Sequence, residues 1–245
     1  MARSLTKVQK AEVVALTKTA EQTKTVVQQL IAPATYFSQG ITSAAEFYPL
    51  LPELFQGTEE GAMTGSRILP QSLTIDFAVN LYYALSQSFD ITAHLFMLTN
   101  NNIKSYNQIG SVSPNFLRDP TPSNPGGVTG FTGGFQNSLL PVDTRAFKVL
   151  HHKKIRLRKG TGIINEGLSG TGVVTPNDAI KYFRVRIKLP KVLKYNETSV
   201  GAVEEYPTNF NPFWCLGWVY NDDSPVDNHT PVTVTAVATL KYKNA

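Results

Sequence analysis

Apolar residues alternate with polar residues in several separate segments, and this period of two is the feature that most restricts the fold. Segment 182–189 (YFRVRIKL) alternates most strictly, with Phe183, Val185 and Ile187 on one face and mainly charged residues on the other. Successive side chains of a β-strand point to opposite faces, so this pattern predicts a strand with one buried face. The chain is therefore expected to be built mainly from strands.

Six segments are predicted as strands. They are 72–81, 89–98, 146–158, 182–189, 213–220 and 232–242. Segment 213–220 (FWCLGWVY) is almost wholly apolar, which is typical of a strand buried on both faces. Long loops join these segments, and a succession of strands of this kind favours an all-β sandwich. A length of 245 residues suits one such domain.

The first part of the chain has a different pattern. Residues 4–32 contain neither Gly nor Pro, and apolar residues recur there at three, four and seven residues. This spacing predicts an amphipathic helix that ends before Pro33. The expected divisions are an N-terminal helical arm (1–33), a connecting segment (34–66) and a β domain (67–245).

Composition argues against several classes of protein. The single cysteine excludes a disulfide framework and a multi-cysteine metal cluster. No run approaches the roughly 20 apolar residues of a membrane span, so we expect no membrane insertion. The first residues lead into no apolar signal sequence, so an intracellular origin is expected. Charged residues make up only 17% of the chain, below the roughly 25% of soluble domains, which favours surface that is buried between subunits.

Local catalytic and metal-binding motifs are absent from the sequence, and a Ser/His/Asp triad assembled from distant positions is left open. The four histidines (His94, His151, His152 and His229) lack the spacing of a zinc site. The Gly-rich run 126–134 lacks the Lys-Ser/Thr ending of a phosphate loop. Asp222, Asp223 and Asp227 predict a polar turn, and a divalent-cation site is the alternative. We expect no enzyme activity, no cofactor and no bound metal.

Positive charge is concentrated in two of the predicted strands. The two clusters lie within residues 145–159 and 181–194. The first includes Lys148, Lys153, Lys154, Arg156 and Arg158, and the second includes Lys181, Arg184, Arg186, Lys188 and Lys191. Neither cluster contains an acid. Six of the cations are expected side by side on a sheet, and they would repel one another unless an anion lies near them. The clusters therefore predict contact with phosphates, with solvated surface charge as the alternative. Tyr182 and Phe147 are candidate platforms for unpaired bases, or else core residues.

The longest loop has an unusual composition. Segment 111–137 carries four prolines and five glycines, together with Phe116, Phe131 and Phe135. The three aromatic rings favour an ordered surface loop that packs on a neighbouring subunit, and a disordered loop is the alternative.

The order of these segments resembles the capsid proteins of circovirus-like viruses, the CRESS-DNA viruses, whose circular single-stranded DNA encodes a replication initiator. Four stretches carry the resemblance. They are the early strand pair RILPQSLTIDFAVN and FDITAHLFMLTNNN, then RAFKVLHHKKIRLRKG, then KYFRVRIKLPKVLKYNE, and finally NPFWCLGWVYNDDSPVDNHTPVTVTAVATLKYKN. The match covers roughly residues 67–244.

The resemblance implies an eight-stranded antiparallel jelly roll in two sheets. It implies that about 60 copies form an icosahedral shell, or virion, around circular single-stranded DNA. Assembly would take place in the host nucleus or cytoplasm, and the host surface receptor is unknown. The two basic clusters fall on the family's matching basic positions.

The chain departs from this family at its N-terminus. Family members begin with a dense arginine-rich arm, whereas Arg3, Lys7 and Lys10 are spread over a partly apolar segment. These three residues are candidate nucleic-acid contacts, and the arm is expected to be helical. Two other classes of protein remain open: the capsid protein of a small positive-strand RNA virus, and a non-viral jelly-roll protein that binds carbohydrate.

Overall fold

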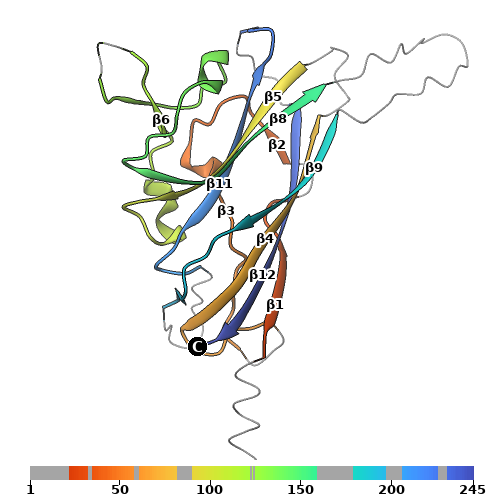
Figure 1. The fold of residues 1–245 in the computed structure, drawn as a ribbon, viewed down its shortest axis with the longest axis vertical. Helices are drawn as coiled ribbons and strands as arrows, with labels where there is room; N and C mark the ends of the chain where they lie inside the picture. Colours follow the sequence, from red (N-terminus) through yellow and green to blue (C-terminus); the bar gives the residue numbers. More distant parts are fainter. Residues whose placement is uncertain are drawn as a thin grey trace, which may run out of the picture.

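The computed structural model describes residues 22–32, 35–57, 61–81, 90–121, 123, 125–158, 179–196, 206–225 and 231–245. Within these residues the chain is an antiparallel β-sandwich of two main sheets joined by loops (Figure 1). The strands are β1 (Lys24–Gln29), β2 (Thr35–Phe37), β3 (Tyr48–Pro49), β4 (Arg67–Leu81), β5 (Asp90–Asn100), β6 (Leu117–Arg118), β7 (Val128–Thr129), β8 (Phe147–Arg158), β9 (Ile180–Ile187), β10 (Leu193–Lys194), β11 (Pro212–Tyr220) and β12 (Val232–Asn244). The 3₁₀ helices are η1 (Ala44–Glu46), η2 (Tyr106–Ser111) and η3 (Phe135–Ser138). The all-β class and the six predicted strands, which are β4, β5, β8, β9, β11 and β12, are confirmed.

The first sheet has β12 and β4 at its centre. β1 and β2 pair with β12 on one side, and β9 and β10 pair with β4 on the other. β4 and β12 pair along their whole length, from Leu81 opposite Val232 to Ile68 opposite Asn244. Among the described strands β9 pairs only with β4, so β9 forms part of one edge of this sheet.

The second sheet has the order β3-β11-β5-β8. β5 pairs with β11 on one side and with β8 on the other, and all of these pairs are antiparallel. β8 therefore forms an edge of the second sheet among the described strands.

The main core lies between the two sheets. Along β4, residues 73, 75, 77, 79 and 81 are buried while the intervening residues are partly exposed. This is the alternation that the sequence predicts, and it directs one apolar face of the strand inward. Trp214 and Trp218 of β11 are fully buried in the same core.

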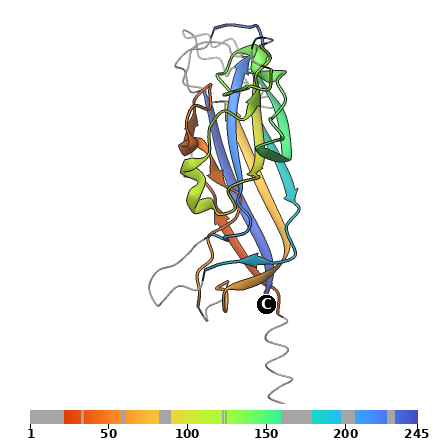
Figure 2. The same cartoon turned by 90° about the vertical axis from the view of Figure 1, so that its left-hand side faces the viewer.

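Loops cover the other face of the second sheet and enclose a smaller core. Phe96 of β5 and Phe213 of β11 pack there with residues of loop 103–147. These loops lie to the left of the sheets in Figure 1 and in front of the strands in Figure 2. β11 is therefore buried on both faces, as its apolar sequence predicts.

Phe116 and Phe131 belong to this smaller core. Both side chains are fully buried within the chain itself, so the prediction that they pack on a neighbouring subunit is wrong. Phe131 lies over Gly217 of β11, where a Cβ atom would come within 2.5 Å of the Phe131 ring. A residue with no side chain is needed at that point so that the loop can approach the strand. Phe135 is exposed, and its role at a subunit contact stays a prediction.

The predicted N-terminal helix is wrong for residues 24–29, which form β1 along the edge of β12. Thr25, Val26 and Val27 are β-branched and suit an extended strand, and pairing with β12 satisfies their backbone groups. The prediction for residues 1–21 falls outside the described residues.

The predicted connecting segment also takes part in the fold. It contributes β2 to the first sheet and β3 to the second. Leu50, Leu51 and Leu54 of this segment are buried in the main core. In the part of the chain that the structure describes, no helix has the length and apolar character to cross a membrane.

Candidate nucleic-acid interface

The two basic strands lie side by side although they belong to different sheets. β8 is an edge of the second sheet and β9 an edge of the first, and the two edges meet on one side of the sandwich (Figure 1). Between them is an open groove of about 450 Å³, which we call the edge groove. It is lined by Lys153, Lys154, Ile155, Arg156, Arg158, Lys181, Tyr182 and Phe183. Five of these eight residues are cationic, so the groove has the charge to attract an anion.

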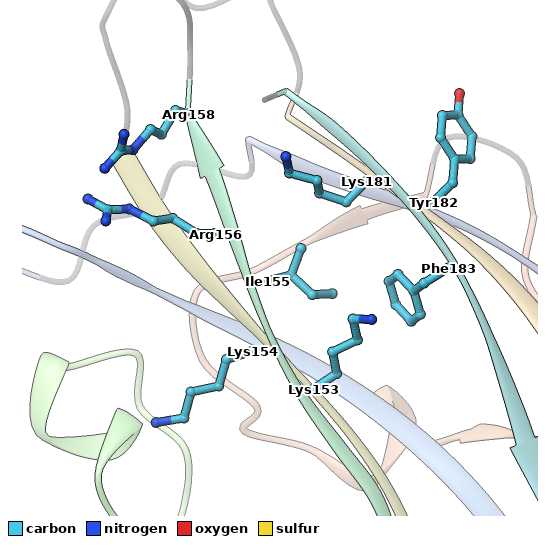
Figure 3. Close-up of a pocket in the computed structure, with 8 residues that line it drawn as sticks. All are labelled: Lys153, Lys154, Ile155, Arg156, Arg158, Lys181, Tyr182 and Phe183. Atoms are coloured by element: carbon cyan, nitrogen blue, oxygen red, sulfur yellow. The ribbon is translucent and has the colours of Figure 1, made fainter. Parts of the chain in front are cut away.

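The cations project in more than one direction. Figure 3 shows Lys153 and Lys181 between the two strands, whereas Lys154, Arg156 and Arg158 extend from the far side of β8. Arg184 and Arg186 are exposed on the outer face of the first sheet. The expectation of six cations side by side on one sheet is therefore wrong, because β8 and β9 belong to different sheets.

Acidic partners come from the neighbouring strands. Arg156 forms a two-pronged ion pair with Asp90 of β5, with distances of 3.1 Å from Nε to Oδ1 and 2.7 Å from Nη2 to Oδ2. Arg158 Nε lies 3.4 Å from the same carboxylate. The hydrogen bond from Arg156 is the largest cause that lowers the pKa of Asp90. Asp90 thus removes one of the five positive charges of the groove.

A second ion pair joins β9 to β4. Arg184 Nε donates to Asp76 Oδ1 at 2.7 Å, and Arg184 Nη2 donates to Asp76 Oδ2 at 3.1 Å. This hydrogen bond raises the pKa of the Arg184 guanidinium. The two basic segments contain no acid, but the inference that their charge is uncompensated is wrong for Arg156, Arg158 and Arg184. Sequence reasoning missed Asp76 and Asp90, since cross-strand neighbours depend on a register that the local sequence does not reveal.

Lys153 links the two edges at the bottom of the groove. Its ammonium group lies 4.2 Å from the ring centre of Phe183, within the range of a cation–π interaction. Phe183 stacks in turn on Phe77 of the main core, with 5.4 Å between ring centres. Lys154, on the other side of β8, donates from Nζ to the carbonyl of Ser138 at 2.6 Å and so ties the strand to η3.

The other predicted nucleic-acid residues lie outside the edge groove. Lys148, Lys188 and Lys191 are exposed, but none of them lines the groove. The last three predicted residues, Arg3, Lys7 and Lys10, fall outside the described residues. The structure therefore brings together Lys153, Lys154, Arg156, Arg158 and Lys181.

The two candidate base platforms differ in exposure. Phe147 is buried in the smaller core and is not available to a ligand. Tyr182 is 76% exposed at the rim of the edge groove. Of these two described rings, Tyr182 is the one available to stack on an unpaired base.

Basic residues on edge strands have a second physical effect. An edge strand presents unpaired backbone groups, and Lys or Arg side chains discourage another strand from pairing with it. The two effects make different predictions for variants with neutral side chains: loss of nucleic-acid binding in the first case, and aggregation in the second.

Other candidate chemistry is not supported in the described part of the chain. No group of three or more His, Cys, Asp or Glu side chains there could hold a metal ion. The Asp222 carboxylate accepts hydrogen bonds from the Ser224 amide and hydroxyl at 3.1 and 2.7 Å, which supports the polar turn. Cys215 is fully buried, and burial raises its thiol pKa well above the ordinary value.

One histidine contact was not predicted from the sequence. His94 Nδ1 lies 3.3 Å from His152 Nε2, across the β5–β8 pair. His94 is fully buried, and burial is the main cause that lowers its pKa to about 3. A neutral, buried ring beside Phe96 and Phe131 belongs to the packing of the smaller core.

No protein-family model matches the chain, and no curated protein matches it significantly.

Proposed function

We propose that this protein is the structural capsid protein of a small virus with a circular single-stranded DNA genome. Many copies, about 60 by the resemblance, close into an icosahedral shell, and each copy contacts the genome through phosphate groups without reading its sequence. The observation that carries the proposal is the edge groove, which is bordered by cations from the edge strands of two different sheets. Such a surface suits a polyanion better than a small neutral ligand.

The pairing of the long strands supports the finer description of the fold as a jelly roll. The first long strand, β4, pairs with the last, β12, and the second, β5, pairs with the next to last, β11. Nested pairs of this kind across two sheets are expected of a jelly roll. The described long strands number six, and β8 and β9 lie at sheet edges. The eight-stranded arrangement therefore remains part of the proposal.

The modest net charge limits how the genome is held. At +5 per chain, about 60 copies carry about 300 positive charges, against about 1,000 or more phosphates in a kilobase-scale genome. Small cations would have to neutralise the remaining phosphates. Contact with phosphates releases their condensed counterions, so packaging should weaken as salt concentration rises.

The proposal is tested by identifying the nucleic acid that the protein protects. The protein is expressed, treated with nuclease, purified by size, and the retained nucleic acid is sequenced with and without DNase. We expect protected circular single-stranded DNA, without sequence preference when several templates are offered. Protected RNA would favour the RNA-virus class. An absence of protected nucleic acid together with specific signals on a glycan array would favour the carbohydrate-binding class.

Variants of the groove separate genome contact from protection of the strand edges. If Lys153→Gln with Lys181→Gln keeps the chain soluble and lowers DNA retention, the groove contacts DNA. If the double variant aggregates with its DNA affinity unchanged, the lysines serve to protect the edges and the proposed contact is wrong.

A further inference from the structure

Tyr182 stands between two separate hollows of the surface. On one side is the edge groove, and on the other is a shallow hollow of about 510 Å³ on the outer face of the first sheet. Tyr182 and Phe183 line both. In Figure 3 the Tyr182 side chain points away from the groove lysines, on the opposite side of β9 from Phe183. A ligand that crosses β9 at this position would touch both hollows.

The second hollow, which we call the sheet hollow, arises from the strand register. Tyr182 of β9 lies opposite Ala78 of β4, and Ala78 lies opposite Thr235 of β12. A large exposed ring beside two small side chains leaves a step on the sheet face, because cross-strand neighbours lie only about 5 Å apart. Val237 extends the apolar part of the floor.

The groups around the sheet hollow suit a flat, partly polar ring. Tyr182 supplies an aromatic wall, and Ala78 with Val237 supplies apolar floor. The next cross-strand row holds the planar Asp76–Arg184 ion pair, whose remaining N–H groups and oxygen atoms can still form hydrogen bonds. A nucleobase has a ring face and a polar edge, and it stacks on aromatic side chains whatever its identity.

We propose that the sheet hollow binds one unpaired base of a single strand whose neighbouring phosphates lie in the edge groove. This inference rests on the proposed function, and it adds that the bases, as well as the phosphates, are contacted. The bases of a duplex are stacked inside the helix and do not reach such a site. The protein should therefore bind single strands in preference to duplexes. An exposed tyrosine can also pack against a neutral sugar ring. The cations beside Tyr182 favour a polynucleotide over such a sugar.

The test compares two oligonucleotides of equal length and equal phosphate number. One is oligodeoxythymidine, and the other carries abasic tetrahydrofuran sites throughout. Binding of each to the full-length protein is measured by fluorescence anisotropy at low salt. We expect the base-bearing strand to bind about fivefold or more tightly than the abasic strand, which is the low end of what one stacked base contributes.

Variants locate this preference. Tyr182→Ala should remove the preference for the base-bearing strand, measured as the ratio of the two affinities, whereas Tyr182→Phe should retain it. Ala78→Leu fills the sheet hollow without changing charge and should weaken only base-bearing binding. Tyr36→Ala is the matched control, since Tyr36 is also exposed and lies on β2 of the same sheet.

The outcomes separate the inference from the proposed function. If both strands bind equally and with the same salt dependence, or if Tyr182→Ala leaves the base preference intact, the base site is wrong while phosphate contact stands. If neither strand binds at low salt, the proposed function fails and the base site fails with it. A signal on neutral glycans that depends on Tyr182, without oligonucleotide binding, would overturn both.

Discussion

Neutralising the two lysines that point into the edge groove should halve the salt dependence of single-stranded DNA binding. Five cations border the groove, on one side or the other of β8, and among the described residues Asp90 offsets one of them, so we take four phosphate contacts as the upper number. For single strands, the logarithm of the binding constant falls with the logarithm of the salt concentration, and each phosphate contacted adds about −0.7 to the slope. Four contacts give a slope of about −2.8, and the double variant Lys153→Gln with Lys181→Gln, with two contacts, gives about −1.4.

These slopes correspond to measurable changes in affinity. Between 50 and 200 mM salt, the unmodified protein should lose about 50-fold in affinity, and the double variant about sevenfold. The assay is anisotropy of a labelled oligodeoxythymidine at several salt concentrations, with circular dichroism to confirm folding, because Lys153 also contacts Phe183. The control is Lys148→Gln with Lys191→Gln, which removes the same charge outside the groove. Equal slopes for the two double variants would refute the reasoning, since binding would then follow net charge alone.

Three further predictions concern Asp90, the loop core and His94. Asp90→Asn should release Arg156 and Arg158 from their ion pairs, steepen the salt slope of DNA binding by about 0.7 and tighten binding at low salt. An unchanged slope would show that these arginines do not contact phosphate. Phe131→Ala should lower the free energy of unfolding by about 3–5 kcal/mol in denaturant titrations, because the ring is fully buried. A loss below about 1 kcal/mol would contradict the assignment of this loop to the core. Burial lowers the pKa of His94 to about 3 in the folded chain, whereas an unfolded histidine has a pKa of roughly 6.5. The contribution of His94 to stability is therefore complete above about pH 6.5 and is lost as the pH falls towards 3. His94→Phe should flatten the fall in melting temperature over that range, and an unchanged pH dependence would contradict the burial argument.

The long strands could be predicted from the sequence because their pattern is local. The alternation in 182–189 predicts one buried face, and the almost wholly apolar segment 213–220 predicts two. The structure agrees with both predictions. The helix prediction failed for β1, where periodic apolar residues were overridden by pairing with β12. The short strands β2 and β3 have no periodic signal to detect.

The composition of the basic surface could be predicted, but its arrangement could not. Runs of Lys and Arg on β8 and β9 are visible in the sequence, whereas their meeting across two sheets is a property of the topology. Asp76 and Asp90 become partners of these cations only through strand register. The sheet hollow beside Tyr182 likewise depends on Ala78 and Thr235, which are far from it in the chain.

Electron microscopy of the purified protein with circular single-stranded DNA tests the central claim most directly. Negatively stained samples are imaged over a range of salt concentration and pH. The account predicts closed particles of one diameter that retain the DNA after nuclease treatment and release it as salt rises. A protein that stays a monomer or small oligomer under every condition would contradict it.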